Sequence, residues 1–63
     1  MLPAMSEYRL YFLNKTDQIV RRKEFDLPND EEALAKAKQY IGGRAMELWT
    51  GTRLIARIDP VKK

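Results

Sequence analysis

An amphipathic helix expected over residues 29–41 (NDEEALAKAKQYI) most constrains what this chain can fold into. At about 100° per residue its apolar side chains share one arc of the helical wheel, and its charged side chains occupy the rest. Asn29 is suited to cap the N-terminus with Glu32 at the capping-box position, and Gly42 to end the helix in the left-handed conformation. The rest of the chain must therefore supply one apolar layer for this arc, which consists of Ala33, Leu34, Ala37, Tyr40 and Ile41.

Four segments typical of β-strands flank this helix, two on each side. Residues 7–13 and 19–27 precede it, and residues 44–49 and 53–58 follow it. All four are rich in branched, aromatic or other large side chains and are bounded by turn residues. The second segment breaks strict alternation of apolar and polar residues, which predicts a β-bulge or a twisted edge strand there.

Turn chemistry separates the strands within each pair. Asn14 and Asp17 are suited to side-chain-to-backbone hydrogen bonds in the first connection, and Gly51 supplies the unusual backbone angle of a tight hairpin in the second. The order ββαββ predicts an α+β fold with one helix packed on a four-stranded antiparallel sheet. A right-handed crossover that leaves both hairpins intact favours the strand order 2-1-3-4.

The chain has the length of a single small domain. We expect residues 6–59 to form this domain, residues 1–5 to be a disordered leader in which Met5 is an alternative start, and residues 60–63 to be a loose basic tail. A chain of 63 residues buries only about 60% of its unfolded surface, so its core needs help from another source. Association with a second copy is the expected source, because the sequence contains no cysteine for a disulfide and no histidine for an ordinary zinc site.

Several classes of function are not expected from this composition. The net charge of +3 is modest for a dedicated nucleic-acid module, and no apolar run has the length of a membrane span or signal peptide. We therefore expect a cytoplasmic protein without a membrane partner, a cofactor or a small-molecule substrate. Catalysis is not expected either, since Ser6 has no histidine to act as its base and Gly42-Gly43 follows a helix instead of opening one.

The alternation of the strands places large side chains on both faces of the sheet. The face covered by the helix is expected to hold Tyr8, Leu10, Phe12, Met46, Leu48, Leu54, Ala56 and Ile58. The opposite face is expected to show an apolar patch that marks an interface, formed by Tyr11, Leu13, Trp49 and Ile55. A homodimer is the favoured interpretation, with two copies packed face to face through this patch or joined edge to edge along the sheet. The alternatives are a different partner, or a curled sheet or folded tail that hides the patch.

Nucleic acid is the alternative ligand of such a face, because bases stack on aromatic rings and cations hold phosphates. The candidate phosphate contacts are Arg9, Arg53 and Arg57 on this face, around Tyr11 and Trp49, and Arg21, Arg22 and Lys23 on the neighbouring edge of the sheet. The same arginines also fit a solvated strand surface paired with Glu7, Glu24 and Glu47. The absence of an RNA-recognition aromatic motif and of a second helix makes nucleic acid possible but not favoured.

The segments YRLYFLNKTDQIV, DEEALAKA and MELWTGTRLIARI together resemble a group of short, uncharacterised proteins of rhizobia and related alphaproteobacteria. The resemblance covers residues 6–58. The turn at residues 14–17 replaces the Asp-Gly type usual in that group, and residues 21–23 are more basic than is typical. The group has no established activity, so the resemblance implies a bacterial cytoplasmic setting and assigns no functional residue.

Overall fold

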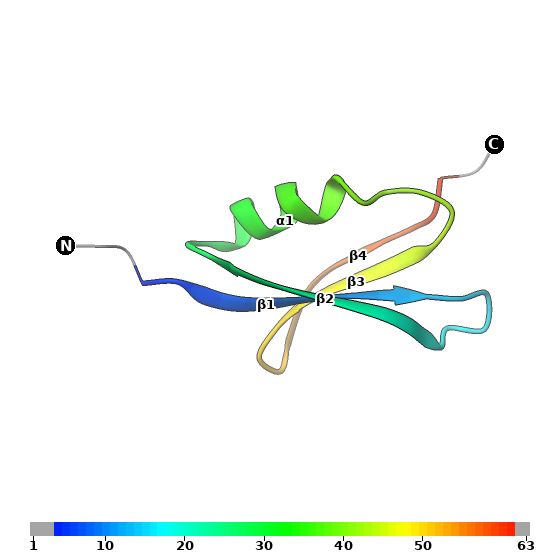
Figure 1. Ribbon diagram of the computed structural model, residues 1–63, viewed down its shortest axis with the longest axis horizontal. Helices are drawn as coiled ribbons and strands as arrows, with labels where there is room; N and C mark the ends of the chain where they lie inside the picture. Colours follow the sequence, from blue (N-terminus) through cyan, green and yellow to red (C-terminus); the bar gives the residue numbers. More distant parts are fainter. Residues whose placement is uncertain (1–3, 62–63) are drawn as a thin grey trace.

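One helix lies on one face of a four-stranded sheet (Figure 1). The computed structural model describes residues 4–61, so the outer parts of the expected leader and tail, 1–3 and 62–63, lie outside the described residues. The elements are β1 (Ser6–Leu13), β2 (Ile19–Leu27), α1 (Asp30–Lys38), β3 (Ala45–Thr50) and β4 (Arg53–Ile58). All neighbouring strands are antiparallel in the order β2-β1-β3-β4. The expected α+β fold and strand order are confirmed.

Helix α1 begins as expected and ends early. The Asn29 side chain accepts a hydrogen bond from the Glu32 amide at 2.9 Å, which confirms the N-cap. After Lys38 the chain tightens, and the amides of Tyr40 and Ile41 donate to carbonyls three residues back at 3.0 and 3.3 Å. Because this turn uses the last carbonyls, no left-handed residue is needed. The left-handed ending predicted for Gly42 is wrong, and Ile41 is 41% exposed instead of buried.

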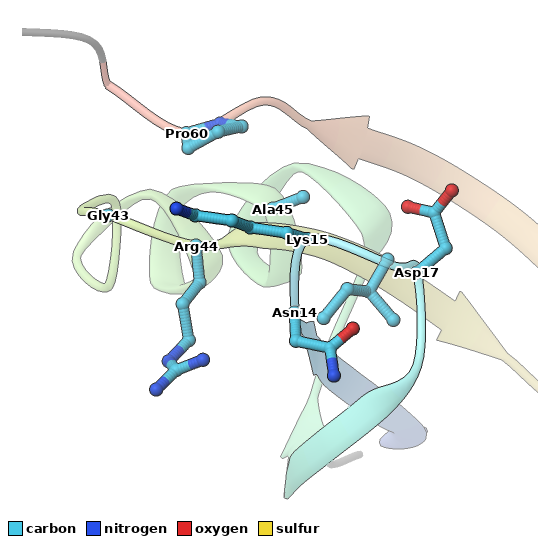
Figure 2. Close-up of a pocket in the computed structure, with 8 residues that line it drawn as sticks. Asn14, Lys15, Asp17, Gly43, Arg44, Ala45 and Pro60 are labelled. Carbon is cyan, nitrogen blue, oxygen red and sulfur yellow. The ribbon is translucent and has the colours of Figure 1, made fainter.

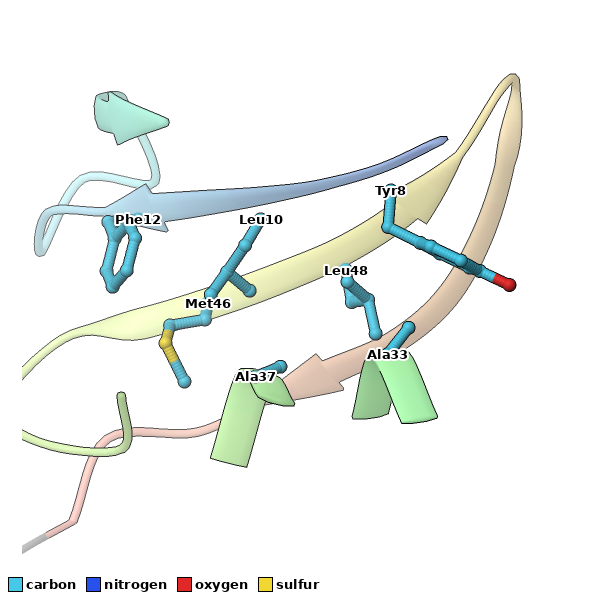
Figure 3. Close-up of a cluster of buried hydrophobic side chains, with 7 residues drawn as sticks. All are labelled: Tyr8, Leu10, Phe12, Ala33, Ala37, Met46 and Leu48. Carbon is cyan, nitrogen blue, oxygen red and sulfur yellow. The ribbon is translucent and has the colours of Figure 1, made fainter. Parts of the chain in front are cut away.

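The core lies between α1 and the two central strands. It consists of Tyr8, Leu10, Phe12, Ala33, Ala37, Met46 and Leu48. Figure 3 shows the two helical alanines facing Met46 and Leu48, and their small size lets the helix approach the sheet closely. Burial of each large side chain contributes about 1.5–3 kcal/mol, and this small set carries much of the stability. These five strand residues are placed as the alternation predicted.

A first β-bulge lies near the start of β2. Phe12 pairs with Arg21 and Leu13 pairs with Ile19, so Val20 is an extra residue. The irregularity expected in this strand is therefore confirmed. Its consequence is that Ile19 shares the face of Leu13, away from the helix, whereas Phe25 and Leu27 pack against the core.

A second bulge, which the alternation did not predict, lies in β4. Leu48 pairs with Ala56 but Trp49 pairs with Leu54, so Ile55 is the extra residue. Ile55 packs against the core, and Leu54, on the face of Trp49, is 45% exposed. The predicted placements of Leu54 and Ile55 are thus both wrong, because one inserted residue reverses the side-chain parity of the strand before it.

The two hairpin connections follow the predicted turn chemistry. The Asn14 Oδ1 atom accepts hydrogen bonds from the amides of Thr16 and Gln18 at 2.9 and 3.0 Å. Asp17 takes the left-handed conformation with φ 62°, and Gly51 has φ 57°. In the second hairpin only the first of the two loop residues has positive φ, which is the type II′ pattern.

The chain after β4 returns to the loop that precedes β3. The Val61 amide donates to the Gly42 carbonyl at 2.8 Å. The tail expected to be loose is therefore attached to the domain at its first residues.

Candidate interaction face

The sheet surface opposite α1 is called the helix-free face here (Figure 1). Strand pairing assigns its members, because residues directly opposite one another share a face. The apolar members are Tyr11, Leu13, Ile19, Trp49 and Leu54. The charged members are Glu7, Arg9, Arg22, Glu24, Asp26, Glu47 and Arg57.

Two of the predicted interface residues form the centre of this face. Tyr11 and Trp49 are half-buried and, with Ile19, Glu47 and Gly51, line a shallow open groove of about 260 Å³. The Trp49 Nε1–H donates to the Glu47 Oε1 atom at 3.2 Å, which fixes the edge of the indole ring. The groove is thus open to solvent and is lined by two aromatic rings and the Glu47 carboxylate.

The other two predicted interface residues do not contribute exposed surface. Leu13 belongs to this face but is only 3% exposed, and Ile55 packs on the core side. Their places are taken by Leu54 and by Ile19, which is 58% exposed. The bulge in β4 exchanges Leu54 and Ile55, and the bulge in β2 places Ile19 on this face. The break in alternation in residues 19–27 was the only signal in the sequence that pointed to either of them.

Opposite charges alternate across the helix-free face. Arg9 lies 3.3 Å from Glu7 and 3.6 Å from Glu24, and Arg22 lies 4.0 Å from Glu24. Arg57 is held between two carboxylates, with 3.0 Å to Asp17 and 3.1 Å to Glu47. The hydrogen bond to Asp17 raises the pKa of Arg57 above its ordinary value. The arginines of this face are therefore already partnered.

The six cations predicted as nucleic-acid contacts do not share one surface. Arg9, Arg22 and Arg57 lie on the helix-free face, as described above. Arg21 and Lys23 pair with Phe12 and Leu10 and so lie on the helix side, where the Lys23 Nζ atom sits 5.3 Å from the centre of the Tyr40 ring. Arg53 also lies on the helix side, opposite Thr50, so its predicted placement on the face opposite the helix is wrong.

A polar cluster that sequence reasoning missed ties three elements together at the start of α1. The Tyr8 hydroxyl donates to Asp30 Oδ1 at 2.9 Å, and Arg53 donates to Asp30 Oδ2 at 3.1 Å. The bond from Arg53, then that from Tyr8, lowers the pKa of Asp30. Burial, followed by the Asp30 contact, raises the pKa of Tyr8. The acidic first turn of the helix indicated that a cation could pair with it, but nothing in the sequence indicated that this cation would be Arg53.

Comparisons of the chain with protein-family models, with curated proteins and with solved structures find no match. Within residues 4–61, no helix is long and apolar enough to cross a membrane. The same part of the chain contains no group of three or more acidic residues arranged to hold a metal ion.

Proposed function

We propose that the protein is a small non-enzymatic binding or accessory protein that self-associates through the helix-free face. The observation that carries this proposal is that one helix covers one side of the sheet only. Exposed Ile19 and Leu54 therefore flank the half-buried Tyr11 and Trp49 on the other side. Large apolar side chains without cover are typical of interaction surfaces, and Trp and Tyr are enriched at binding hot spots.

A second copy of the chain is the occupant that suits this face best. Its charges are three arginines and four carboxylates, and each arginine lies within 4.0 Å of a glutamate, so positive and negative groups are interspersed over the face. Under a two-fold axis, such a mixed surface meets itself without like-charge repulsion, as an isologous interface requires. A chain of 63 residues has a small core, so it also gains stability when the apolar surface of this face is buried against a second copy. A bacterial cytoplasmic setting is part of the proposal and rests on the sequence resemblance alone.

Sedimentation equilibrium over a wide concentration range tests the proposal. We expect the mass to rise from 7.4 kDa towards twice that value as concentration increases. Leu54→Asp is expected to abolish the rise, because a charge would be buried at the interface. Ile41→Asp is the matched control, since Ile41 is similarly exposed, 41% against 45%, but lies outside the helix-free face. A monomer at every concentration, or equal loss in both variants, would overturn the proposal.

Nucleic-acid binding through the same face is the second candidate, supported by the aromatic pair Tyr11 and Trp49 next to Arg9 and Arg57. The carboxylate partners of both arginines weigh against it, because a phosphate would have to displace them. Titration with single-stranded RNA or DNA, followed by Trp49 fluorescence, separates the two functions. Binding that weakens steeply with salt and is lost in Arg9→Ala plus Arg57→Ala would favour nucleic acid. No change at micromolar strand concentrations would exclude it.

A further inference from the structure

A pocket separate from the groove at Trp49 lies at the end of the sheet where β1 ends and β3 begins (Figure 2). It has an open volume of about 560 Å³. Three segments that are distant in sequence meet there: the hairpin loop after β1, the loop before β3, and the chain after β4. The bond from the Val61 amide to the Gly42 carbonyl holds the last two segments together. The lining residues are Leu13, Asn14, Lys15, Asp17, Gly43, Arg44, Ala45 and Pro60.

The charged groups of this pocket are predominantly positive. Figure 2 shows the Lys15 side chain extending across the pocket towards Gly43, while the Arg44 side chain starts near it and runs in another direction. Neither cation forms an ion pair with any other residue of the described range. The single carboxylate of the lining belongs to Asp17, which forms an ion pair with Arg57 at 3.0 Å.

Backbone donors add to these two cations. The amides of Gly43 and Arg44 have no hydrogen-bond acceptor among residues 4–61, although they border the pocket. Unpaired consecutive amides are used in many proteins to hold anions. The lining therefore offers a guanidinium, an ammonium and two N–H groups with no internal partner.

The surrounding charges favour an anion at this end of the molecule. Arg21 pairs with Phe12, one residue before Leu13, and Lys36 and Lys38 lie in the last turn of α1. The opposite end carries Glu7 paired with Asp26, together with the acidic first turn of α1. The molecule is thus acidic at one end and basic at the other, and an approaching anion is drawn to the basic end.

We propose that this pocket binds a phosphate group through Lys15, Arg44 and the amides of Gly43 and Arg44. A guanidinium can donate hydrogen bonds to two phosphate oxygens at once, and a lysine adds a positive charge. The backbone amides can donate to the remaining phosphate oxygens. The volume admits a phosphorylated small molecule as well as the terminal phosphate of a nucleic-acid strand. The pocket adjoins the helix-free face at Leu13, which is only 3% exposed, but Lys15, Gly43 and Arg44 are not members of that face, so phosphate binding is tested separately from self-association.

Amide-resolved NMR titration of the full chain tests this site with three probes: inorganic phosphate, a phosphorylated sugar, and a 5′-phosphorylated oligothymidine. Sodium chloride of equal ionic strength is the reference for each. We expect saturable shifts at residues 13–17 and 43–45 with phosphate and not with chloride. Tighter binding of the sugar phosphate or of the oligothymidine identifies the source of the group.

Two variants of equal net charge decide whether the pocket itself binds. Lys15→Ala plus Arg44→Ala is expected to weaken binding at least about tenfold, the loss of one or two charge-assisted hydrogen bonds. Arg22→Ala plus Lys23→Ala lowers the net charge by the same amount, away from the pocket and from the cations that surround it, and is expected to leave binding within about twofold. Shifts absent with every probe, or weakened equally in both variants, would overturn the proposal.

Discussion

Trp49 faces Leu54 across the β3–β4 hairpin, whereas an unbroken register would place Ile55 opposite the indole ring. The inserted Ile55 side chain packs against the core instead. Leu54 thereby becomes the apolar neighbour of Trp49 on the helix-free face, with 45% of its surface exposed. A single bulge thus decides which residue supports the fold and which is left for contact with another molecule.

This register predicts opposite effects for two adjacent substitutions. Ile55→Ala is expected to lower the free energy of unfolding by about 1–2 kcal/mol, because a partly buried side chain is removed from the core. Leu54→Ala is expected to change it by less than about 0.5 kcal/mol, as for other exposed positions. Urea denaturation at low protein concentration measures both. Equal losses, or a larger loss for Leu54→Ala, would show that the bulge is misplaced.

The tight β3–β4 turn predicts a cost for any side chain at Gly51. A Cβ at this position meets nothing within 4 Å, but φ is 57°, so Gly51→Ala is disfavoured by backbone conformation alone. The expected loss of stability is about 1 kcal/mol. Gly43→Ala is the matched control, because its added Cβ also meets open space and its φ is not positive. Its stability is expected to stay equal or to rise by about 0.5 kcal/mol, measured by thermal unfolding.

Asp17 combines a left-handed backbone with an ion pair, and substitutions separate the two. Asp17→Asn keeps a residue that tolerates φ 62° and loses only the exposed pair with Arg57, so the expected loss is below about 1 kcal/mol. Asp17→Ala is expected to be less stable than Asp17→Gly by about 1 kcal/mol, because alanine is disfavoured in this conformation. The difference between wild type and Asp17→Asn should shrink in 1 M salt, as screening acts on the ion pair alone (about 3 Å Debye length). A difference that persists in salt would exclude the ion pair as its cause.

The contacts of Asp30 predict part of the acid sensitivity of the fold. Arg53 and Tyr8 lower its pKa, so the folded state holds this carboxylate ionised at pH values where the unfolded chain already binds a proton. The resulting stabilisation is fully present above the ordinary aspartate pKa and is lost as pH falls through the lower, folded value. Denaturation midpoints from pH 6 down to pH 2 should therefore fall less steeply in Asp30→Asn than in the wild type. Glu31→Gln removes the neighbouring carboxylate, which has no ion-pair partner within residues 4–61, and is expected to leave the slope unchanged.

Regular features of the chain were predictable from the sequence because they depend on local chemistry. The Asn29 cap, the Asn14 turn and the Gly51 hairpin each need one residue type at one position. Alternation in β1 and β3 correctly separated Tyr8, Leu10 and Phe12, which face the helix, from Tyr11 and Trp49. With short connections between paired strands, these features were sufficient for the element order and the sheet order.

The parts that were not predictable depend on pairing between strands. Nothing in the sequence RLIARI indicates that β4 contains a bulge. The bulge nevertheless places Arg53 and Leu54 on the faces opposite to those expected. The early end of α1 is of the same kind, since three-residue hydrogen bonds satisfied the carbonyls that Gly42 was expected to serve. The pocket proposed to bind phosphate is formed by segments that are far apart in the chain, so no contiguous sequence motif predicts it.

The strand order β2-β1-β3-β4 also bears on how the chain folds. Each outer strand pairs only with its sequence neighbour, so the two hairpins and α1 require no distant contact to form. The pairing of β1 with β3, in which Leu10 lies opposite Leu48, joins the two halves and closes the longest loop in the sheet. Closing this loop costs conformational entropy before the β1–β3 contacts can stabilise the chain. The docking of β1 on β3 is therefore expected to be the rate-limiting step of folding. Substitutions at the β1–β3 seam should therefore slow folding, whereas those in the hairpin turns should chiefly speed unfolding.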